Sequence, residues 1–370
     1  MMLSVNTKKL LSMMSSNYKY TVLDLFCGCG GLSKGFEMAG YDIILGVDFN
    51  EPALKTYLHN HKGSKALCGD LSSSSTFDTI DSIIEDKSVD VIIGGPPCQG
   101  FSLTGSRNFE DERNRLYLAM IEAIRRYTPK AFVIENVPGM ATLYKGEVKN
   151  EIIRRLTAMG YSVSCQILCA ADYGVPQIRK RLVFVGLKSG ELFEFPTPTN
   201  TPDNYVSCEQ AIGDLPSLEN VLGADVSEYE NDPITEYQRL MRGECSVLYN
   251  HKAIDHKDFV KATIALVPDG GNYKDLPEGV GESRKFNMAW TRYCSFKPSR
   301  TIDTGHRNNF HYKWNRCPTV RESARLQSFP DNFVFLGTKT QQDRQVGNAV
   351  PCLLAKAIGE QVLKYINKKK

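Results

Sequence analysis

The stretch TVLDLFCGCGG at residues 21–31 decides the fold class of this chain. Its first six residues are mostly β-branched or apolar and predict a buried strand over 21–26, whereas its last five form a glycine-rich turn. A helix is predicted directly afterwards, over 32–39. A strand that runs through glycines into a helix is typical of α/β sheets, which bind ligands at the carboxyl ends of their strands. We therefore expect the turn to approach a ligand with its backbone.

The same alternation of short apolar runs and longer amphipathic stretches continues to Gly186. It is the pattern of a doubly wound α/β sheet. Further strands are predicted over 43–47, 64–68, 91–93, 131–134, 162–169 and 182–186. Helices are predicted between them, over 52–59, 115–127 and 149–159. The fold class is therefore α/β, with a Rossmann-like sheet in the first half of the chain.

After Gly186 the pattern changes, because a proline-rich connection at 195–203 is followed by about a hundred residues without clear periodicity. Helix signals return at 319–329 and 351–364. We predict a first domain over residues 1–190 and a smaller, irregular domain with a hinge over 191–340. The last segment, 341–370, is predicted to carry a helix that returns to the first domain.

The composition excludes several classes of protein. With 42% hydrophobic and 24% charged residues, the chain of 370 residues has the balance of a globular protein, and its apolar runs are too short to span a membrane. The eleven cysteines are expected to be reduced thiols, and a cytoplasmic location is expected. Residues 284–321 hold nine basic residues against one acid, together with aromatic side chains that include Trp290, Tyr293, Phe310, Tyr312 and Trp314. This basic segment is compatible both with nucleic-acid binding and with a solvated face.

Acidic residues follow the second and third predicted strands. Asp48 and Phe49 lie about 20 residues after the glycine turn, the spacing at which an acid meets a ribose, and Asp70 ends the third strand. Each acid alone is more often a helix cap or turn residue. Together with the aromatic ring they suit a nucleoside without a diphosphate, as in S-adenosylmethionine. Ser33 replaces the third glycine that a nicotinamide fingerprint requires.

Cys98 follows the fourth predicted strand in the sequence GGPPCQGFS, residues 94–102. Two prolines fix the backbone before it and flanking glycines leave it unshielded, so the thiol is presented as a nucleophile would be. Glu135 ends the neighbouring strand and lies at the same edge of the sheet. A zinc deaminase is excluded because Phe101 stands where a second cysteine is needed, and a serine hydrolase elbow because Thr104 replaces glycine.

Because it contains these residues in this order, the chain resembles the DNA cytosine-5 methyltransferase family of the bacterial restriction-modification type. Six ordered blocks carry the resemblance over most of its length. They are DLFxGxGG at 24–31, GPPCQ at 95–99, ENV at 135–137, QxRxR at 177–181, RESARLQSFPD at 321–331 and QVGNAVP at 345–351. Cys27 and Cys29 depart from the small residues that are usual in the first block.

The resemblance implies transfer of a methyl group from S-adenosylmethionine to carbon 5 of a flipped-out cytosine in a specific duplex DNA sequence. Cys98 would attack carbon 6 and Glu135, as an acid, would protonate ring nitrogen 3. Arg179 and Arg181 would hold the base oxygen and the developing charge. The irregular domain would then recognise the DNA target. A cognate restriction endonuclease is an expected counterpart, and a monomer is the expected state.

The resemblance also implies the binding residues. Those expected at the cofactor are Phe26, Gly28, Gly30, Gly31, Asp48, Phe49, Asp70, Leu71, Pro97, Leu116, Asn348 and Ala349. Those expected at DNA are Gln99, Ser102, Gln177 and Arg292. Gln177 is included because alternation on an extended segment would point it the same way as the two arginines that follow. No metal is expected.

Two alternatives remain open. Relatives of the family methylate a cytosine in a tRNA anticodon loop with the same residues, but they usually carry a Cys-Phe-Thr signature, which this chain lacks, and threonine in place of Ser102. A DNA-binding relative without activity is disfavoured because Cys98, Glu135 and Arg181 are all present. DNA methylation is therefore the preferred interpretation.

Overall fold

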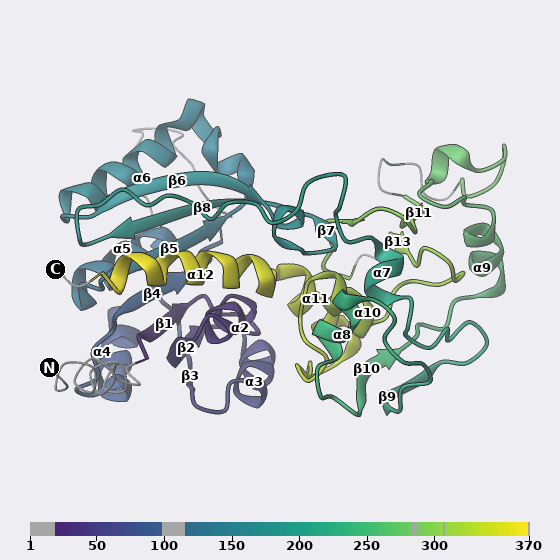
Figure 1. Ribbon diagram of the computed structural model, residues 1–370, viewed down its shortest axis with the longest axis horizontal. Helices are drawn as coiled ribbons and strands as arrows, with labels where there is room; N and C mark the ends of the chain where they lie inside the picture. The colour runs from purple at the N-terminus through teal and green to yellow at the C-terminus, as the bar shows by residue number, and fades with distance from the viewer. Residues whose placement is uncertain (1–18, 98–114, 283–285, 287–288, 306–307, 369–370) are drawn as a thin grey trace, which may run out of the picture.

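The computed structural model describes residues 19–97, 115–282, 286, 289–305 and 308–368. Its main feature is a seven-stranded sheet in the order β3-β2-β1-β4-β5-β8-β6 (Figure 1). The strands are β1 (Thr21–Leu25), β2 (Asp42–Asp48), β3 (Lys65–Cys68), β4 (Val91–Gly94), β5 (Ala131–Asn136), β6 (Ser162–Cys169) and β8 (Lys180–Leu187). The first five are parallel, and β8 is antiparallel to both of its neighbours. All seven predicted strands are confirmed, with small shifts at their ends.

Helices cover both faces of this sheet. They are α2 (Gly31–Met38), α3 (Glu51–Asn60), α4 (Ser74–Ile84), α5 (Arg115–Tyr127), α6 (Glu147–Ala158) and α12 (Cys352–Ile366). The central strands bury both of their faces, so that Ile92 packs in the core beneath α4, α5 and α6 while its neighbour Ile93 packs beneath α2, α3 and α12. The predicted α/β class with a doubly wound, Rossmann-like sheet is confirmed.

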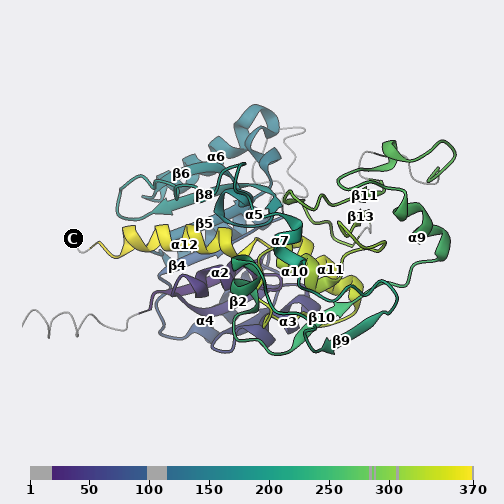
Figure 2. The ribbon, with the colours of Figure 1, turned by 45° about the vertical axis from the view of Figure 1, so that its right-hand side comes forward.

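The rest of the chain forms a second lobe of short elements. They are β7 (Gln177–Ile178), α7 (Cys208–Ile212), β9 (Gly223–Ser227), α8 (Glu236–Arg242), β10 (Leu248–Lys252), α9 (Asp258–Ala265), β11 (Thr291–Arg292), β12 (Ser299–Arg300), β13 (Asn309–Phe310), α10 (Val320–Leu326) and α11 (Lys339–Asn348). Single 3-10 turns lie at Pro138–Ala141, Leu143–Gly146, Ala170–Tyr173 and Tyr273–Asp275. In both views α9 lies at the end of this lobe farthest from the sheet (Figure 1, Figure 2).

Side-chain amides and hydroxyls join the two lobes. Asn60, the last residue of α3, both donates to the carbonyl of Val334 and accepts from its amide, each at 2.8 Å. Thr56 on the same helix accepts from the amide of Leu336 at 2.9 Å. The last helix returns to the sheet lobe, where Tyr41 donates to the carbonyl of Gly359 on α12. The division into domains at residues 190 and 340 stays a prediction.

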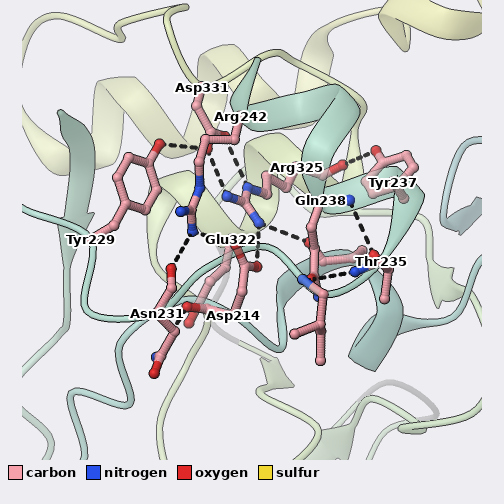
Figure 3. A network of polar contacts seen from close by, with 12 residues as sticks. Asp214, Tyr229, Asn231, Thr235, Tyr237, Gln238, Arg242, Glu322, Arg325 and Asp331 are labelled. Carbon is pink, nitrogen blue, oxygen red and sulfur yellow. Dashed lines mark hydrogen bonds and ion pairs between the residues drawn. The ribbon is translucent and has the colours of Figure 1, made fainter. Parts of the chain in front are cut away.

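A buried ionic network holds the second lobe together (Figure 3). Arg325 on α10 forms ion pairs with Asp331 at 2.7 Å and with Asp214 at 2.5 Å, and all three side chains are fully buried. Tyr229 donates to Asp331 at 2.6 Å, and Arg242 on α8 pairs with Asp214 at 2.9 Å. The carboxylates therefore cross-link α8 and α10, which also share an apolar core.

In the part of the chain that the structure describes, no helix is both long enough and apolar enough to cross a membrane.

Candidate active site

The glycine turn closes the carboxyl end of β1. Phe26, Gly28 and Gly30 have φ angles of 59°, 53° and 97°, so the backbone enters the left-handed region at three of six positions. A side chain added at Gly28 would meet no atom within 4 Å, which leaves open space beside its backbone. A side chain at Gly31 would lie 2.5 Å from the carbonyl oxygen of Val350. The turn therefore needs glycine both for its shape and for this close approach.

Asp48 ends β2 and holds the turn. Its Oδ2 accepts from the amide of Gly28 and its Oδ1 from the amide of Asn50, both at 2.8 Å. Burial raises the pKa of Asp48, while these backbone hydrogen bonds lower it. The neighbouring Phe49 side chain is 70% exposed, which is unusual for a large apolar ring. A buried acid and an exposed ring thus stand next to each other at the edge of the sheet.

The other residues predicted at the cofactor differ in their exposure. Asp70 is exposed after β3 and accepts from the amide of Ser72 at 2.8 Å, whereas Leu71 is only 3% exposed and packs in the core. Leu116 on α5 is half-buried. Asn348 is exposed at the end of α11, and Ala349 would contact a side chain at Gly31 at 3.0 Å. Segments far apart in the sequence therefore meet at the glycine turn.

These residues fit the adenosine part of S-adenosylmethionine. The exposed Phe49 ring can stack on an adenine, and the Asp48 carboxylate can accept from a ribose hydroxyl. The open space beside Gly28 lets the ligand approach the backbone. No cluster of three or more metal-binding side chains lies among the described residues.

Glu135, on β5, lies beside the loop that leads to Cys98. A side chain at Gly95 would be 3.1 Å from its Oε2, and the adjacent Asn136 donates to the carbonyl of Pro96 at 2.9 Å. Pro97 is exposed. Asn136 was missed as a functional residue because its sequence block does not reveal which carbonyl it binds. Cys98, Gln99 and Ser102 lie outside the described residues.

Arg179, which lies between β7 and β8, and Arg181 on β8 differ in their contacts. Arg181 Nε is 2.5 Å from Glu135 Oε1, and both side chains are partly accessible. Arg179 is 2% exposed and donates to the carbonyls of Gly347 and Ala349 at 2.9 and 3.0 Å. Burial and the nearby charge of Arg181 together lower the pKa of Arg179 to about 9, although Glu135 opposes the decrease. Only Arg181 therefore pairs directly with Glu135.

The protonation of Glu135 follows from this setting. Burial raises the pKa of Glu135 above its usual value, although Arg181 and Arg179 oppose the increase. A carboxyl group whose pKa is raised keeps its proton to higher pH than an exposed glutamate. The arrangement can hold an acid next to a cation at the edge of the sheet where β4 ends and the chain continues toward Cys98.

Two predicted DNA contacts are wrong. Gln177 is fully buried, where it donates to the carbonyl of Leu326 and accepts from the amide of Ile302. Arg292 is 5% exposed, and its guanidinium donates to four backbone carbonyls and to the side chain of Asn315. Both side chains have their polar atoms satisfied inside the second lobe, so neither is available to a DNA groove.

The basic segment is likewise not a charged, aromatic face. Arg316 and Arg321 are buried, and Trp290, Tyr293 and Phe310 are each less than 5% exposed. The arginines bind internal carbonyl and carboxylate groups, and the rings form cores. Among the described residues of this segment, the exposed basic and aromatic side chains are Phe286, Phe296, Lys297, Arg300 and Lys313. Arginines and phenylalanines of this segment occur both buried and exposed, so composition alone does not predict which side chains are accessible.

Comparison with known proteins shows which family the chain belongs to. A family model described as C-5 cytosine-specific DNA methylase matches residues 20–364. Type II methyltransferase M1.HphI of Haemophilus parahaemolyticus is 41% identical over 351 residues, covering 93% of this chain and 87% of that protein. Type II methyltransferase M.DdeI of Desulfomicrobium norvegicum is 38% identical over 370 residues, covering 93% and 88%.

Solved structures agree with this result. One from E. coli, described as a prophage-encoded DNA modification methyltransferase, superposes with a TM-score of 0.78 at 27% identity, covering 95% of this chain and all of that one. The Dnmt2 methyltransferase of S. pombe, at 18% identity and a TM-score of 0.58, shares the fold. The chain belongs to the C-5 cytosine-specific DNA methylase family, and it methylates carbon 5 of cytosine in DNA with S-adenosylmethionine as the methyl donor.

Proposed function

We propose that methyl transfer proceeds through a covalent adduct between Cys98 and carbon 6 of a cytosine flipped out of a specific duplex DNA sequence. The observation that carries the proposal is the position of Glu135, which pairs with Arg181 and lies against Gly95 in the loop that leads to Cys98. Carbon 5 of cytosine is a poor nucleophile until a group adds at carbon 6. A thiolate that adds at carbon 6 and an acid that protonates nitrogen 3 would together meet that requirement.

The steps follow from the side chains. The Cys98 thiolate forms a bond to carbon 6, the ring electrons move toward nitrogen 3, and Glu135 protonates that nitrogen. Arg181 lies beside the base and stabilises the negative charge, while Arg179 holds the 347–349 backbone. S-adenosylmethionine supplies the electrophilic methyl group that carbon 5 then takes up. A base then takes the carbon 5 proton, the Cys98 thiolate leaves carbon 6, and nitrogen 3 returns its proton to Glu135, which restores the ring and the acid.

The proposed cofactor contacts follow the same geometry. Phe49 and Phe26 would flank the adenine, Asp48 would bind the ribose, and Asp70 the adenine amino group. Asn348 and Ala349 would meet the methionine end, where Ala349 lies close to Gly31. Leu71 would contribute through packing beneath the site because its side chain is buried.

A label-transfer assay tests the function. Tritiated S-adenosylmethionine is expected to label duplex DNA and to leave tRNA unlabelled, and labelled tRNA with inert DNA would overturn the choice of substrate. Bisulfite sequencing of DNA from cells that express the chain then gives the methylated site. The relatives named Type II methyltransferases support a restriction endonuclease acting at the same site as the counterpart. We propose a monomer as the active form.

The Glu135→Gln variant should lower kcat by about 10²- to 10³-fold, because glutamine keeps the shape of the side chain but transfers no proton to nitrogen 3. In the wild type, the protonated acid is the active form, so activity should fall as pH rises through the raised pKa of Glu135. The variant should lack this alkaline decrease. A pH profile of kcat measures both effects, and an unchanged alkaline limb would contradict the role.

We further propose that DNA contacts a hollow of about 300 Å³ that is lined in part by Phe296, Lys297 and Arg300. Phe296 is 70% exposed and both basic residues are exposed. The adjacent strand β12 pairs with β7, so Arg300 lies opposite Ile178, next to the arginines of the active site. An exposed ring and two exposed cations around one hollow suit contact with a nucleic-acid backbone and its bases.

The Lys297→Gln variant is expected to weaken DNA binding and to reduce the slope of log K against log salt by about 1, because one phosphate contact is lost. Fluorescence anisotropy across a salt series measures the slope. Lys364→Gln, at the exposed end of α12 in the other lobe, is the matched control and should leave it unchanged. Equal slopes for the wild type and Lys297→Gln would place the DNA elsewhere.

A further inference from the structure

A buried histidine lies at the end of α3, beneath the cofactor turn. His61 is 1% exposed, and its Nδ1 lies 2.6 Å from Glu37 Oε1 on α2. Burial raises the pKa of Glu37, but the hydrogen bonds and charges of His61 and Lys34 outweigh it and hold the pKa below its usual value. Glu37 is therefore an ionised acceptor, which assigns the Nδ1 proton of the ring to this hydrogen bond.

Aromatic rings hold His61 on two sides. The Tyr57 ring, one turn earlier on α3, lies with its centroid 4.4 Å away, and the Phe333 ring from the second lobe meets it edge-on at 6.0 Å. With Glu37 fixing one nitrogen, the orientation of the imidazole is determined. Its other nitrogen, Nε2, is buried and has no hydrogen-bond partner among the described residues.

This unpartnered edge of the imidazole faces the glycine turn. A side chain added at Gly30 would lie 2.1 Å from His61 Nε2, so the ring contacts the backbone of Gly30 directly. Gly30 closes the turn, because its amide donates to the carbonyl of Cys27 and its carbonyl accepts from the amide of Lys34. The His61 ring therefore contacts the turn at Gly30, the residue that directly precedes α2.

We propose that the Glu37–His61 pair is a positioning element of the cofactor site, which presses the imidazole edge against Gly30 and fixes the turn. With Gly30 fixed, the amide of Gly28 stays in line with Asp48, and the open space beside Gly28 keeps its shape. Neither side chain of the pair touches the cofactor. Their effect is on its affinity, since a binding site must be held to within about 0.5 Å to be effective.

His61→Asn tests this proposal. The asparagine amide can still donate to Glu37, but it leaves the space against Gly30 empty. Isothermal titration of the protein without DNA should show a dissociation constant for S-adenosylmethionine raised about tenfold. The KM for S-adenosylmethionine should rise in parallel, whereas kcat at saturating cofactor should stay within about threefold and the affinity for DNA alone should not change.

Tyr41→Phe is the matched control. It removes the buried hydrogen bond from Tyr41 to the carbonyl of Gly359, in the same layer of the protein but away from the turn. It should lower Tm without changing the affinity for S-adenosylmethionine. A His61→Asn protein that loses Tm but keeps wild-type cofactor affinity, or a Tyr41→Phe protein that loses as much affinity, would overturn the proposal. If His61→Asn shows no cooperative melting, Glu37→Gln, which keeps the side-chain shape, takes its place in the same measurements.

Discussion

Replacement of Cys98 by serine is expected to lower methyl transfer by on the order of 10⁴-fold or more, the scale seen when an enzyme loses its covalent nucleophile. A serine hydroxyl is far less acidic than a thiol, and no base that would activate it is part of the proposed mechanism. DNA that carries 5-fluorocytosine tests the adduct directly, because fluorine at carbon 5 cannot leave as a proton would. The wild type should form a complex that survives denaturation, and Cys98→Ser should form none.

The control for this experiment is another cysteine. Cys165 on β6 is half-buried, and burial raises the pKa of its thiol to about 11, so it holds little thiolate near neutral pH. Cys165→Ser should transfer methyl groups and trap DNA as the wild type does. Mass spectrometry of the trapped peptide should find the base on Cys98. An undiminished complex in Cys98→Ser would sink the covalent mechanism while leaving the family assignment intact.

Much of the sheet could be predicted because its central strands are buried on both faces and have continuous apolar sequences. All four residues of β4 are buried, for example, and no polar residue interrupts them. Helix α4 was missed because it begins within the run of serines at residues 72–75, which reads as a loop. Its buried apolar residues, Phe77, Ile80 and Ile84, have helical spacing but are too few to predict a helix.

The acidic residues of the site could be placed from the sequence because they directly follow predicted strands, and parallel strands end at one edge of the sheet. Arg292 could not be placed in this way. Its acceptors come from residues 264–267 and 311–315, so its burial depends on segments that meet only in the folded chain. The support of Gly30 by His61 is equally invisible, since about thirty residues separate the two.

The buried ionic network should make the second lobe sensitive to a single substitution. Arg325 is fully buried between Asp331, which it binds through two nitrogens, and Asp214 (Figure 3). Arg325→Met leaves two carboxylates in the interior without their shared cation. The loss of one member of a buried ion pair costs about 3 to 5 kcal/mol, so we expect the free energy of unfolding to fall by that amount at pH 7.

The effect of pH separates this explanation from a simple loss of packing. Although burial raises the pKa of Asp331, its contacts with Arg325 hold the pKa below the usual value, so in the wild type its contribution to stability is present above the unfolded pKa and is lost as pH falls. In Arg325→Met, Asp214 keeps its pair with Arg242, but the ion pair left to Asp331 among the described residues is the 3.8 Å contact to Arg321. Asp331 can then take up a proton instead, so the difference between variant and wild type should shrink as pH falls toward about 4. Urea denaturation at several pH values measures this difference.

Arg125→Met, which breaks an exposed pair with Glu122, is the control and should leave the urea midpoint unchanged at every pH. A deficit for Arg325→Met that stays constant with pH would show that lost packing, and not unpaired charge, destabilises the lobe.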